Sequence, residues 1–543
     1  MTSVTLPDSL VHTSSRPNSA ACSPFQWGCR VRSFTHLRTL IPTTRLTQPN
    51  EAGPPDTSYQ ANPQAPLSPF WWFVLSLCGL VAFLCVTAGA TEGSPREIAI
   101  FTVVSSLVGL LCVRQVYPTR ESSASFLFVV CFSLFNLGLA PFVAFGIKVP
   151  TFGLSVYDTS WLYSTAFPRA MTLAMIGLLA LLVGTTFGRL LGKGTFRKPD
   201  TPETRSARDA LSVFLGLPGA ALMAIAVLAF FAIALSHGGF GVFASGYPNW
   251  LAATHGSPLP YVYALIGFGT GILAISTKSR ARTIGAILFL AYALPALVVG
   301  LRAEVLFPIV SAVVMGAFRS PLLNGKRFFA VLIVALLVVS GIRTFREVGF
   351  ADATATSPSS GLSFNAFDGL AEMGYSLRPT VVVLQWQEEG QQPLDGGSFE
   401  SPFIRLAHST LPVLGPNTPA LTDPDILNSV VAQRVGPIGF SQTAEAYDNW
   451  GTAGVIGFLL AIGLALSWID RSPLKASSLL IRNSVFVPLL LEVRNTFTPV
   501  PAQVMLGLVA SFVVLAYARH RLARSSRVLG PQQPLQLASR SGS

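Results

Sequence analysis

The chain has 543 residues, of which 51% are hydrophobic and 11% charged. Because a soluble domain carries about a quarter charged residues, this composition excludes a soluble globular protein and indicates an integral membrane protein. The net charge of +12 comes from basic residues in short loops without an aromatic-basic patch, so it does not indicate nucleic-acid binding.

The N-terminal segment, residues 1–69, is rich in Ser, Thr, Pro and Gln and has no apolar periodicity. This pattern predicts either a disordered cytoplasmic tail or a translation start assigned too far upstream. No cleavable signal pattern follows Met1, so we expect the first apolar segment to act as the insertion signal. None of the six cysteines lies between residues 343 and 450, so no disulfide framework is expected there.

Apolar segments long enough to cross about 30 Å of hydrocarbon recur along the chain. The fold class predicted is an all-α polytopic membrane protein with about 12 transmembrane helices, in a range of about 10–14. Nine of these lie in residues 70–342 and three in 451–517, with a cytoplasmic tail at 518–543. The predicted spans are 70–89, 98–116, 125–146, 170–190, 211–236, 259–276, 284–300, 305–318, 328–342, 451–469, 478–492 and 501–517.

Basic residues orient these spans, because short cytoplasmic loops accumulate Lys and Arg. Clusters fall between predicted spans at 193–208, 278–282, 319–327 and 471–475, and again after the last span. All of them lie on one side of the membrane if the twelve spans hold. Both termini are therefore expected in the cytoplasm. The 343–450 segment becomes one large outward loop containing amphipathic helices, with twelve Asp/Glu, five Arg and no Lys.

Several arginines lie on the predicted outer side, which is unexpected because the charge bias predicts few Lys and Arg residues there. Arg302 lies in a tight outer turn, Arg343 and Arg346 leave the ninth span, and Arg494 lies in the turn at 493–496. A guanidinium fork binds phosphate oxygens in a bidentate manner and stays charged. These arginines either bind the pyrophosphate of a lipid-linked substrate, or pair with nearby carboxylates and lipid head groups.

Within the outward loop, apolar residues recur at three- and four-residue spacing and predict an amphipathic helix over about 363–378, ended by Pro379. Its other faces are expected to be solvated or to contact substrate. The apolar positions are Phe364, Phe367, Leu370, Met373 and Leu377, and the polar ones are Asp368, Glu372, Tyr375 and Arg378.

The pair Asp423 and Asp425 resembles the two-carboxylate metal motif of many glycosyltransferases. Asp425 also directly precedes an apolar helical run, which is the usual place of an N-cap, and the sequence favours this cap and turn. His408 is the only histidine in the loop. A lone histidine is more typical of a structural hydrogen bond than of a catalytic base.

The loop closes with Glu445, Tyr447, Asp448 and Asn449 directly before the tenth span. A carboxylate at a membrane boundary, partly desolvated and near arginines, can act as a base toward a sugar hydroxyl. The alternative is an N-terminal carboxylate that the helix dipole favours. Glu445 is the candidate catalytic residue.

Three segments carry a resemblance to a known family: Gly300–Arg302, Leu370–Ser376 and Gly439–Gly451. In this order the chain resembles the oligosaccharide repeat-unit polymerases, the O-antigen polymerase (Wzy-type) family. The resemblance covers roughly 100–517 and is clearest over 295–460. The related O-antigen ligases place a histidine near the end of their large outer loop, where this sequence has Glu445.

The resemblance implies a membrane glycosyltransferase of the bacterial cytoplasmic membrane. It would join undecaprenyl-pyrophosphate-linked oligosaccharide repeats into O-antigen, capsule or exopolysaccharide at the outer face. Neither a metal nor a cofactor is expected, and a chain-length regulator and a flippase are the expected partners. Substrate contacts are assigned to the outer arginines and to three loop residues: Arg302, Arg343, Arg346, Glu372, Arg378, Tyr447 and Arg494.

Two other classes compete with a polymerase. A lipid-linked oligosaccharide flippase or other transporter would show paired broken helices or internal symmetry, with short outer loops. The sequence predicts none of these. A scaffold or sensor in envelope assembly has no motif that excludes it.

Overall fold

A computed structural model describes residues 68–89, 94–117, 120–150, 159–192, 210–254, 256–318, 323–355, 365–411, 423–436, 438–471 and 476–529. These residues form helices and connecting turns, with no β-strand among them. The expected all-helical fold is confirmed for this part of the chain. Residues 1–67 of the predicted tail at 1–69, and the last residues, 530–543, lie outside the described residues.

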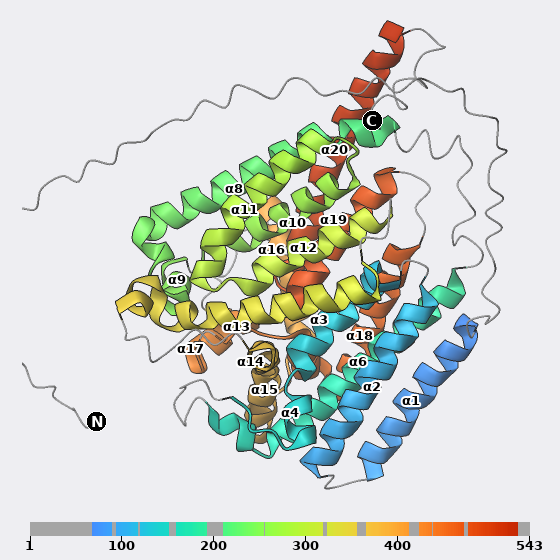
Figure 1. The fold of residues 1–543 in the computed structure, drawn as a ribbon. Helices are drawn as coiled ribbons and strands as arrows, with labels where there is room; N and C mark the ends of the chain where they lie inside the picture. The colour runs from blue at the N-terminus through green and yellow to red at the C-terminus, as the bar shows by residue number, and fades with distance from the viewer. Residues whose placement is uncertain are drawn as a thin grey trace, which may run out of the picture. The chain divides into compact units, whose positions relative to one another are not determined.

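Every apolar segment predicted as a span is helical (Figure 1). The segment at 125–146 is split between two helices, and the last helix continues past the predicted end at 517. The helices are α1 Pro69–Gly89, α2 Pro95–Val116, α3 Ala124–Leu137, α4 Ala140–Phe145, α6 Ala166–Leu191, α8 Gly216–Gly238, α10 Leu259–Ile275, α11 Ser279–Val299, α12 Arg302–Ala317, α13 Gly325–Ala355, α18 Gln442–Asp470, α19 Ala476–Glu492 and α20 Val500–Leu529.

The number of helices that can cross a membrane is smaller than the number predicted. Within the described ranges, eight are long and apolar enough to do so. The count becomes nine if α10 and the preceding α9 (Tyr247–Thr254), which meet at a bend of 107°, form one span. Helices α3, α12 and α19 have only 14, 16 and 17 residues. The chain is thus a multi-pass membrane protein by helix composition, and twelve spans remain a prediction.

Close packing of small residues joins the helices. Helix α6 lies against α18 where a Cβ added to Gly463 would come within 2.8 Å of the Thr185 nitrogen, so the two backbones nearly touch. Such contacts are typical of membrane helices, because lipid and leucine are equally apolar and close approach supplies the attraction. Helices α1, α2 and α3 pack around α6, while α8, α10, α11, α12, α19 and α20 form a second group.

Helix ends that the prediction assigns to the same side of the membrane lie in contact, which agrees with spans that cross in alternating directions. On the predicted cytoplasmic side, the Ala124 and Ser125 nitrogens donate to the Asp470 carboxylate at 2.6 and 2.8 Å. On the predicted outer side, the Gln503 side chain donates to the Pro260 carbonyl at 3.0 Å. Segments assigned to one side therefore meet each other, as the charge bias requires.

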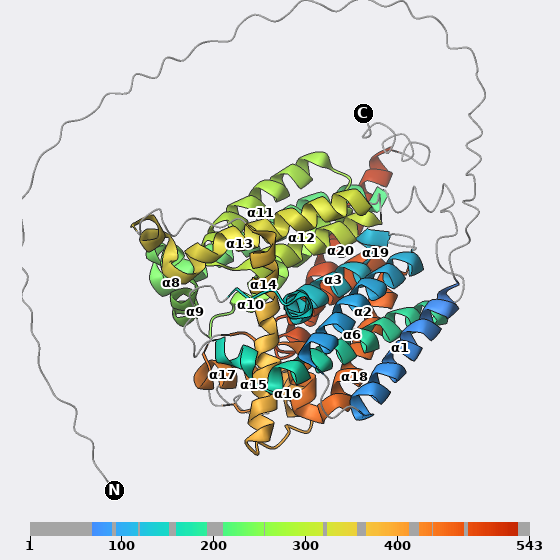
Figure 2. The ribbon, with the colours of Figure 1, turned by 60° about the horizontal axis from the view of Figure 1, so that its bottom comes forward.

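The predicted outward loop contains several short helices, and the one expected over 363–378 is divided among three of the elements. They are α14 Ala366–Gly374, the 3₁₀ turn η5 Tyr375–Leu377, α15 Arg378–Glu388, α16 Gly397–Thr410 and α17 Leu427–Arg434. In Figure 1 the labels of α14, α15 and α17 lie in the lower half of the view, and in Figure 2 α15, α16 and α17 lie toward the lower edge with α14 nearer the middle. The prediction that Pro379 ends the helix is wrong. Pro379 lies in the first turn of α15, where its missing N–H has no intrahelical partner to lose.

The predicted faces of α14 are also wrong in part. Phe367 is 58% exposed, whereas Glu372, expected on a polar face, is buried. A Cβ at Gly374 would lie 2.6 Å from the Leu139 nitrogen, and one at Gly138 would lie 2.8 Å from the Leu370 carbonyl oxygen. The position of α14 is therefore determined by backbone contact through glycines at the α3–α4 junction. It is not determined by the periodic spacing of its apolar residues.

We predict that the outward loop is reachable from outside the cytoplasmic membrane. A cysteine at the exposed position Ser409 should react with a membrane-impermeant maleimide in spheroplasts, because it lies in the long segment without lysine. Ser398, in contrast, is buried and is unsuitable for labelling. A cysteine at the exposed Ser279, on the predicted cytoplasmic side, is the matched control and should react only after lysis. The reverse pattern would invert the topology.

Candidate functional site

Helix α18 is broken at the predicted membrane boundary. It begins after Ser441, whose side chain accepts a hydrogen bond from the Ala444 nitrogen. Trp450 and Gly451 then leave helical geometry, and Gly451 takes a φ of 60°, which glycine adopts without steric cost. The two turns before the break, residues 442–449, are thus oriented separately from the membrane half. They carry the residues with which the loop closes.

Glu445 joins three segments that are far apart in the sequence. Its Oε1 accepts a hydrogen bond from the Ser398 hydroxyl at 2.8 Å, and its Oε2 accepts one from the Phe497 nitrogen at 2.7 Å. The side chain is fully buried. Since both donors belong to other segments, the carboxylate connects α18 to α16 and to the turn at 493–499. Stabilisation by its own helix dipole does not account for this geometry.

Asn449 completes the same network. Its Nδ2 donates to the Ser398 hydroxyl at 2.8 Å and to the Glu445 carbonyl at 2.7 Å, while its Oδ1 accepts from the Gly396 nitrogen at 3.0 Å. Ser398 therefore accepts from one buried side chain and donates to another. Sequence reasoning missed Ser398, because no local pattern connects it to a segment almost fifty residues later.

Two predicted substrate contacts bind each other. The Arg302 guanidinium, at the start of α12, lies 2.8 Å from the Glu372 carboxylate of α14. The two side chains are 4% and 8% exposed. The reading of Glu372 as part of a solvated face is thus wrong. The pair joins the outward loop to the short helix α12.

The remaining predicted contacts are dispersed. Arg494 is half-buried in the 493–499 turn, its carbonyl accepts a hydrogen bond from the Phe440 nitrogen at 3.4 Å, and no ion pair holds its guanidinium in the part of the chain described. Tyr447 and Arg378 are also half-buried, on α18 and at the start of α15. Arg343 and Arg346 lie on α13, but their side chains are outside the described residues.

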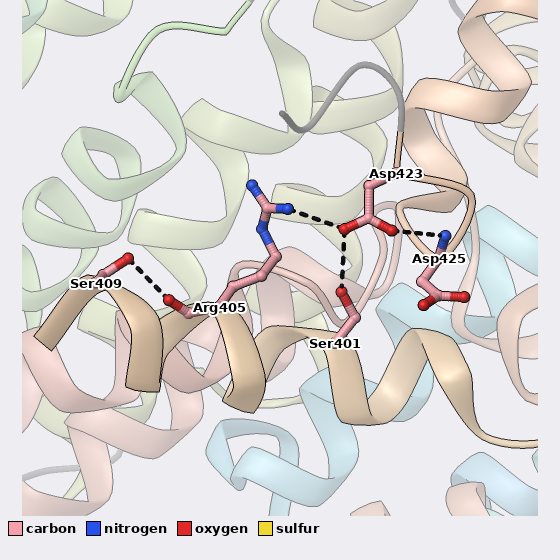
Figure 3. A network of polar contacts seen from close by, with 5 residues as sticks. All are labelled: Ser401, Arg405, Ser409, Asp423 and Asp425. Atoms are coloured by element: carbon pink, nitrogen blue, oxygen red, sulfur yellow. Dashed lines mark hydrogen bonds and ion pairs between the residues drawn. The ribbon is translucent and has the colours of Figure 1, made fainter. Parts of the chain in front are cut away.

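The two aspartates of the metal-like motif form a turn (Figure 3). Asp423 accepts hydrogen bonds from Arg405 at 2.9 Å, from Ser401 at 3.5 Å and from the Asp425 nitrogen at 3.0 Å. The predicted turn is confirmed, but the predicted N-cap at Asp425 is wrong because α17 begins after Ile426. Within the described ranges, no group of three or more His, Cys, Asp or Glu is arranged to hold a metal ion.

Asp425 lies in an unusual electrostatic environment. Partial burial raises the pKa of its carboxyl, and the negative charges of Asp423 and Glu400 raise it further. Neighbouring negative charges and burial both disfavour the ionised form of a carboxyl. The structural role of the motif is indicated by the hydrogen bonds of Asp423.

A cavity of about 440 Å³ lies beside the Glu445 network. Helices α9, α10, α17 and α20, the first turn of α12, the end of α19 and the 493–499 turn surround it. Three aromatic residues, Tyr247, Trp250 and Tyr263, line it together with Glu304 and Glu492. Asn495 and Thr496 of the turn held by Glu445 also line the cavity. The candidate site therefore consists of a sugar-sized cavity with a buried carboxylate network behind one wall.

The comparison with protein families agrees with this architecture. A family model described as O-antigen polysaccharide polymerase Wzy matches residues 70–523. The chain belongs to this family. The Wzy match covers α1 from its second residue, the described helices α2 to α19, the whole 343–450 segment and most of α20. By its description, this is a family of O-antigen polysaccharide polymerases.

A curated relative is similar to part of this Wzy-family chain. Protein CapE of Staphylococcus aureus is 24% identical over 264 residues, which is 48% of this chain. The match spans 57% of the length of CapE. No solved structure matches the chain.

Proposed function

We propose that the protein joins undecaprenyl-pyrophosphate-linked oligosaccharide repeats into a surface polysaccharide, which is O-antigen, capsule or exopolysaccharide. The reaction would take place at the outer face of the bacterial cytoplasmic membrane. The family match over residues 70–523 supports the reaction class. One observation supports the location: the buried Glu445 network holds the turn that lines the cavity, on the predicted outer side.

Glycosyl transfer of this kind has two chemical requirements. The acceptor hydroxyl oxygen bonds to the anomeric carbon of the donor sugar and loses its proton to a base. The bond from that carbon to the pyrophosphate breaks, and the lipid pyrophosphate leaves with the electron pair. Positive groups stabilise the departing oxygens. Carboxylates and arginines meet both requirements, so the proposal needs neither metal nor cofactor.

We assign the base to Glu445. Its carboxylate does not line the cavity, but it accepts a hydrogen bond from the Phe497 nitrogen of the 493–499 turn, whose Asn495 and Thr496 do line it. Movement of this turn on substrate binding would free one carboxylate oxygen to face the acceptor hydroxyl. Ser398, which donates to Oε1 of Glu445, and Asn449, which donates to Ser398, would keep that oxygen in place.

We assign the pyrophosphate contact chiefly to Arg494, which lies on the same turn and is half-buried. Arg302 acts through Glu372, since its charge is already paired. Arg343, Arg346, Arg378 and Tyr447 stay proposed substrate contacts on the predicted outer side. The expected partners, a chain-length regulator and a flippase, also remain proposals.

A flippase is the second candidate, and one observation favours it. Transporters place substrates at broken helices, and the sequence predicted none here. The described chain nevertheless has a break in α18 at Trp450–Gly451 and a bend of 107° between α9 and α10. These are two breaks in the described helices, but nothing relates them as a pair, so the prediction that paired broken helices are absent stays a prediction. The large outward loop still supports the polymerase.

The length of the surface polysaccharide distinguishes these functions. A strain lacking this chain should carry single repeats, without the ladder of longer polymers that gel electrophoresis of surface polysaccharide resolves. The wild-type chain should restore this ladder. We predict that Arg494→Lys restores much less, because lysine keeps the charge but loses the bidentate fork. Arg405→Lys, at the Asp423 turn, is the matched control and should restore a normal ladder. Loss of all surface repeats in the deletion strain would support the flippase instead.

A further inference from the structure

The cavity beside the Glu445 network has a chemical character that the proposed reaction does not explain. Its lining includes two acidic side chains, Glu304 and Glu492, and no Lys, Arg or His. It also includes three amide side chains, Asn428, Asn495 and Gln503. The cavity is therefore acidic and rich in hydrogen-bond acceptors. A pyrophosphate would be repelled from it.

Glu492 is the most informative group in this lining. It ends α19 and is 1% exposed, yet no hydrogen-bond donor in the described part of the chain reaches either carboxylate oxygen. Gln503 donates to the Pro260 carbonyl, but its own carbonyl oxygen accepts no bond from the described residues. A buried carboxylate without donors is costly, so it is retained where water or a ligand supplies them. Both groups line the same cavity.

The aromatic residues indicate which ligand supplies these donors. Tyr247, Trp250 and Tyr263 come from α9 and α10 and line the cavity together with Glu492. An aromatic ring offers an apolar face and, in Tyr and Trp, a polar edge. A pyranose has the complementary surface, with C–H groups on its faces and hydroxyls around its rim. Pockets of this size combine apolar walls with a few placed polar groups.

We propose that this cavity binds sugar residues of the lipid-linked repeat unit, with Glu492 and Gln503 accepting hydrogen bonds from sugar hydroxyl or acetamido groups. The proposal rests on the proposed function for the identity of the sugar. It adds a binding site to that function and makes Glu492 a substrate-binding residue. Asn428 of α17 donates to Thr496 at 3.2 Å, so the loop and the turn close the cavity together.

Binding can be measured without polymerisation. The probe is the repeat-unit oligosaccharide released by mild acid from the lipid-linked intermediate of the producing strain. In purified full-length protein, Ser429→Cys places a thiol in the lining, and its alkylation by N-ethylmaleimide is followed by mass spectrometry. At a concentration of about ten times its Kd, the oligosaccharide should slow alkylation of the thiol about tenfold. Ser409→Cys, on the exposed end of α16, should be unaffected.

Two variant pairs test the residues. Ala432→Trp fills the cavity and should abolish protection, whereas Gln433→Trp, exposed at the next position of α17, should retain it. Glu492→Gln should weaken binding by about 2- to 10-fold, because the amide replaces one of the two acceptor oxygens by a donor and so removes one hydrogen bond from the sugar. It should not lower the thermal unfolding midpoint, because neither carboxylate oxygen of Glu492 has a hydrogen bond to lose among the described residues.

Three outcomes overturn the proposal: no protection by the oligosaccharide, equal protection by undecaprenyl pyrophosphate without sugar, or unchanged protection in Glu492→Gln. These are distinct from failure of the proposed function. If the deletion strain loses the ladder but the oligosaccharide does not protect Ser429→Cys, the cavity is not the sugar site and the polymerase function stands. If the oligosaccharide protects but the deletion strain makes a normal ladder, the sugar site stands and the polymerase function is wrong.

Discussion

Replacement of Glu445 by Gln is expected to abolish the polysaccharide ladder while the protein still inserts and accumulates. Gln is nearly isosteric, so its carbonyl oxygen can still accept from the Phe497 nitrogen and its NH₂ can donate to Ser398. What it cannot do is take a proton, and loss of a general base costs about 10²–10⁴ in rate. Gel electrophoresis of surface polysaccharide, beside immunoblots of the membrane fraction, measures both quantities.

Asp448→Asn is the matched control, because it makes the same change at a buried carboxylate three residues away. We expect this variant to keep its ladder. If Glu445→Gln also makes a ladder of normal length at normal protein level, the carboxylate serves to hold the 493–499 turn. The base would then be sought among the other carboxylates of the predicted outer side, first at Glu492.

Replacement of Arg302 by Met is expected to destabilise the protein strongly. It leaves the Glu372 carboxylate buried without its cation, and breaking a buried pair costs about 3–5 kcal/mol. The double variant Arg302→Met/Glu372→Leu should recover most of this stability, because no uncompensated charge remains. Thermal unfolding of the detergent-solubilised protein tests both. Arg169→Met, which breaks the exposed pair with Glu388, is the control and should cost about 0–1 kcal/mol.

The same double variant separates two roles of Arg302. A stable double variant with a normal ladder means that the pair only joins α14 to α12. A stable double variant without a ladder means that one of the two side chains also contacts substrate. A single variant as stable as the wild type would contradict the assignment of a buried structural pair.

The sequence predicted the helices well because length and apolar composition determine them directly. It predicted the outward loop less well, because contact between Gly138 and the backbone of α14 places that helix. An amphipathic period carries no information about such a contact. The period therefore assigned Phe367 to the buried face, although this residue is exposed.

The candidate site was predicted only where it is local in sequence. Glu445 was identifiable because it is a carboxylate directly before a span. Its partners Ser398 and Phe497 belong to segments about fifty residues away on either side, so only the fold brings them together. Glu492 was missed because it was counted as the last residue of an apolar span. A charged residue inside such a segment costs free energy and is itself a signal of function.

The break in α18 at Trp450–Gly451 has a mechanical consequence. Bilayers differ in thickness, and a spanning helix responds to the mismatch by tilting. In an unbroken helix, this tilt would carry Glu445 with it. Here the φ of 60° at Gly451 separates the two halves, while the Phe399 and Trp450 rings stack at 5.1 Å and hold the outer half against α16. The Phe399 ring also packs on Phe458 of the membrane half at 4.8 Å. Helix α16 therefore contacts α18 on both sides of the break, and a change in the tilt of the membrane half reaches the Glu445 network through α16 and its Ser398, not along the helix axis.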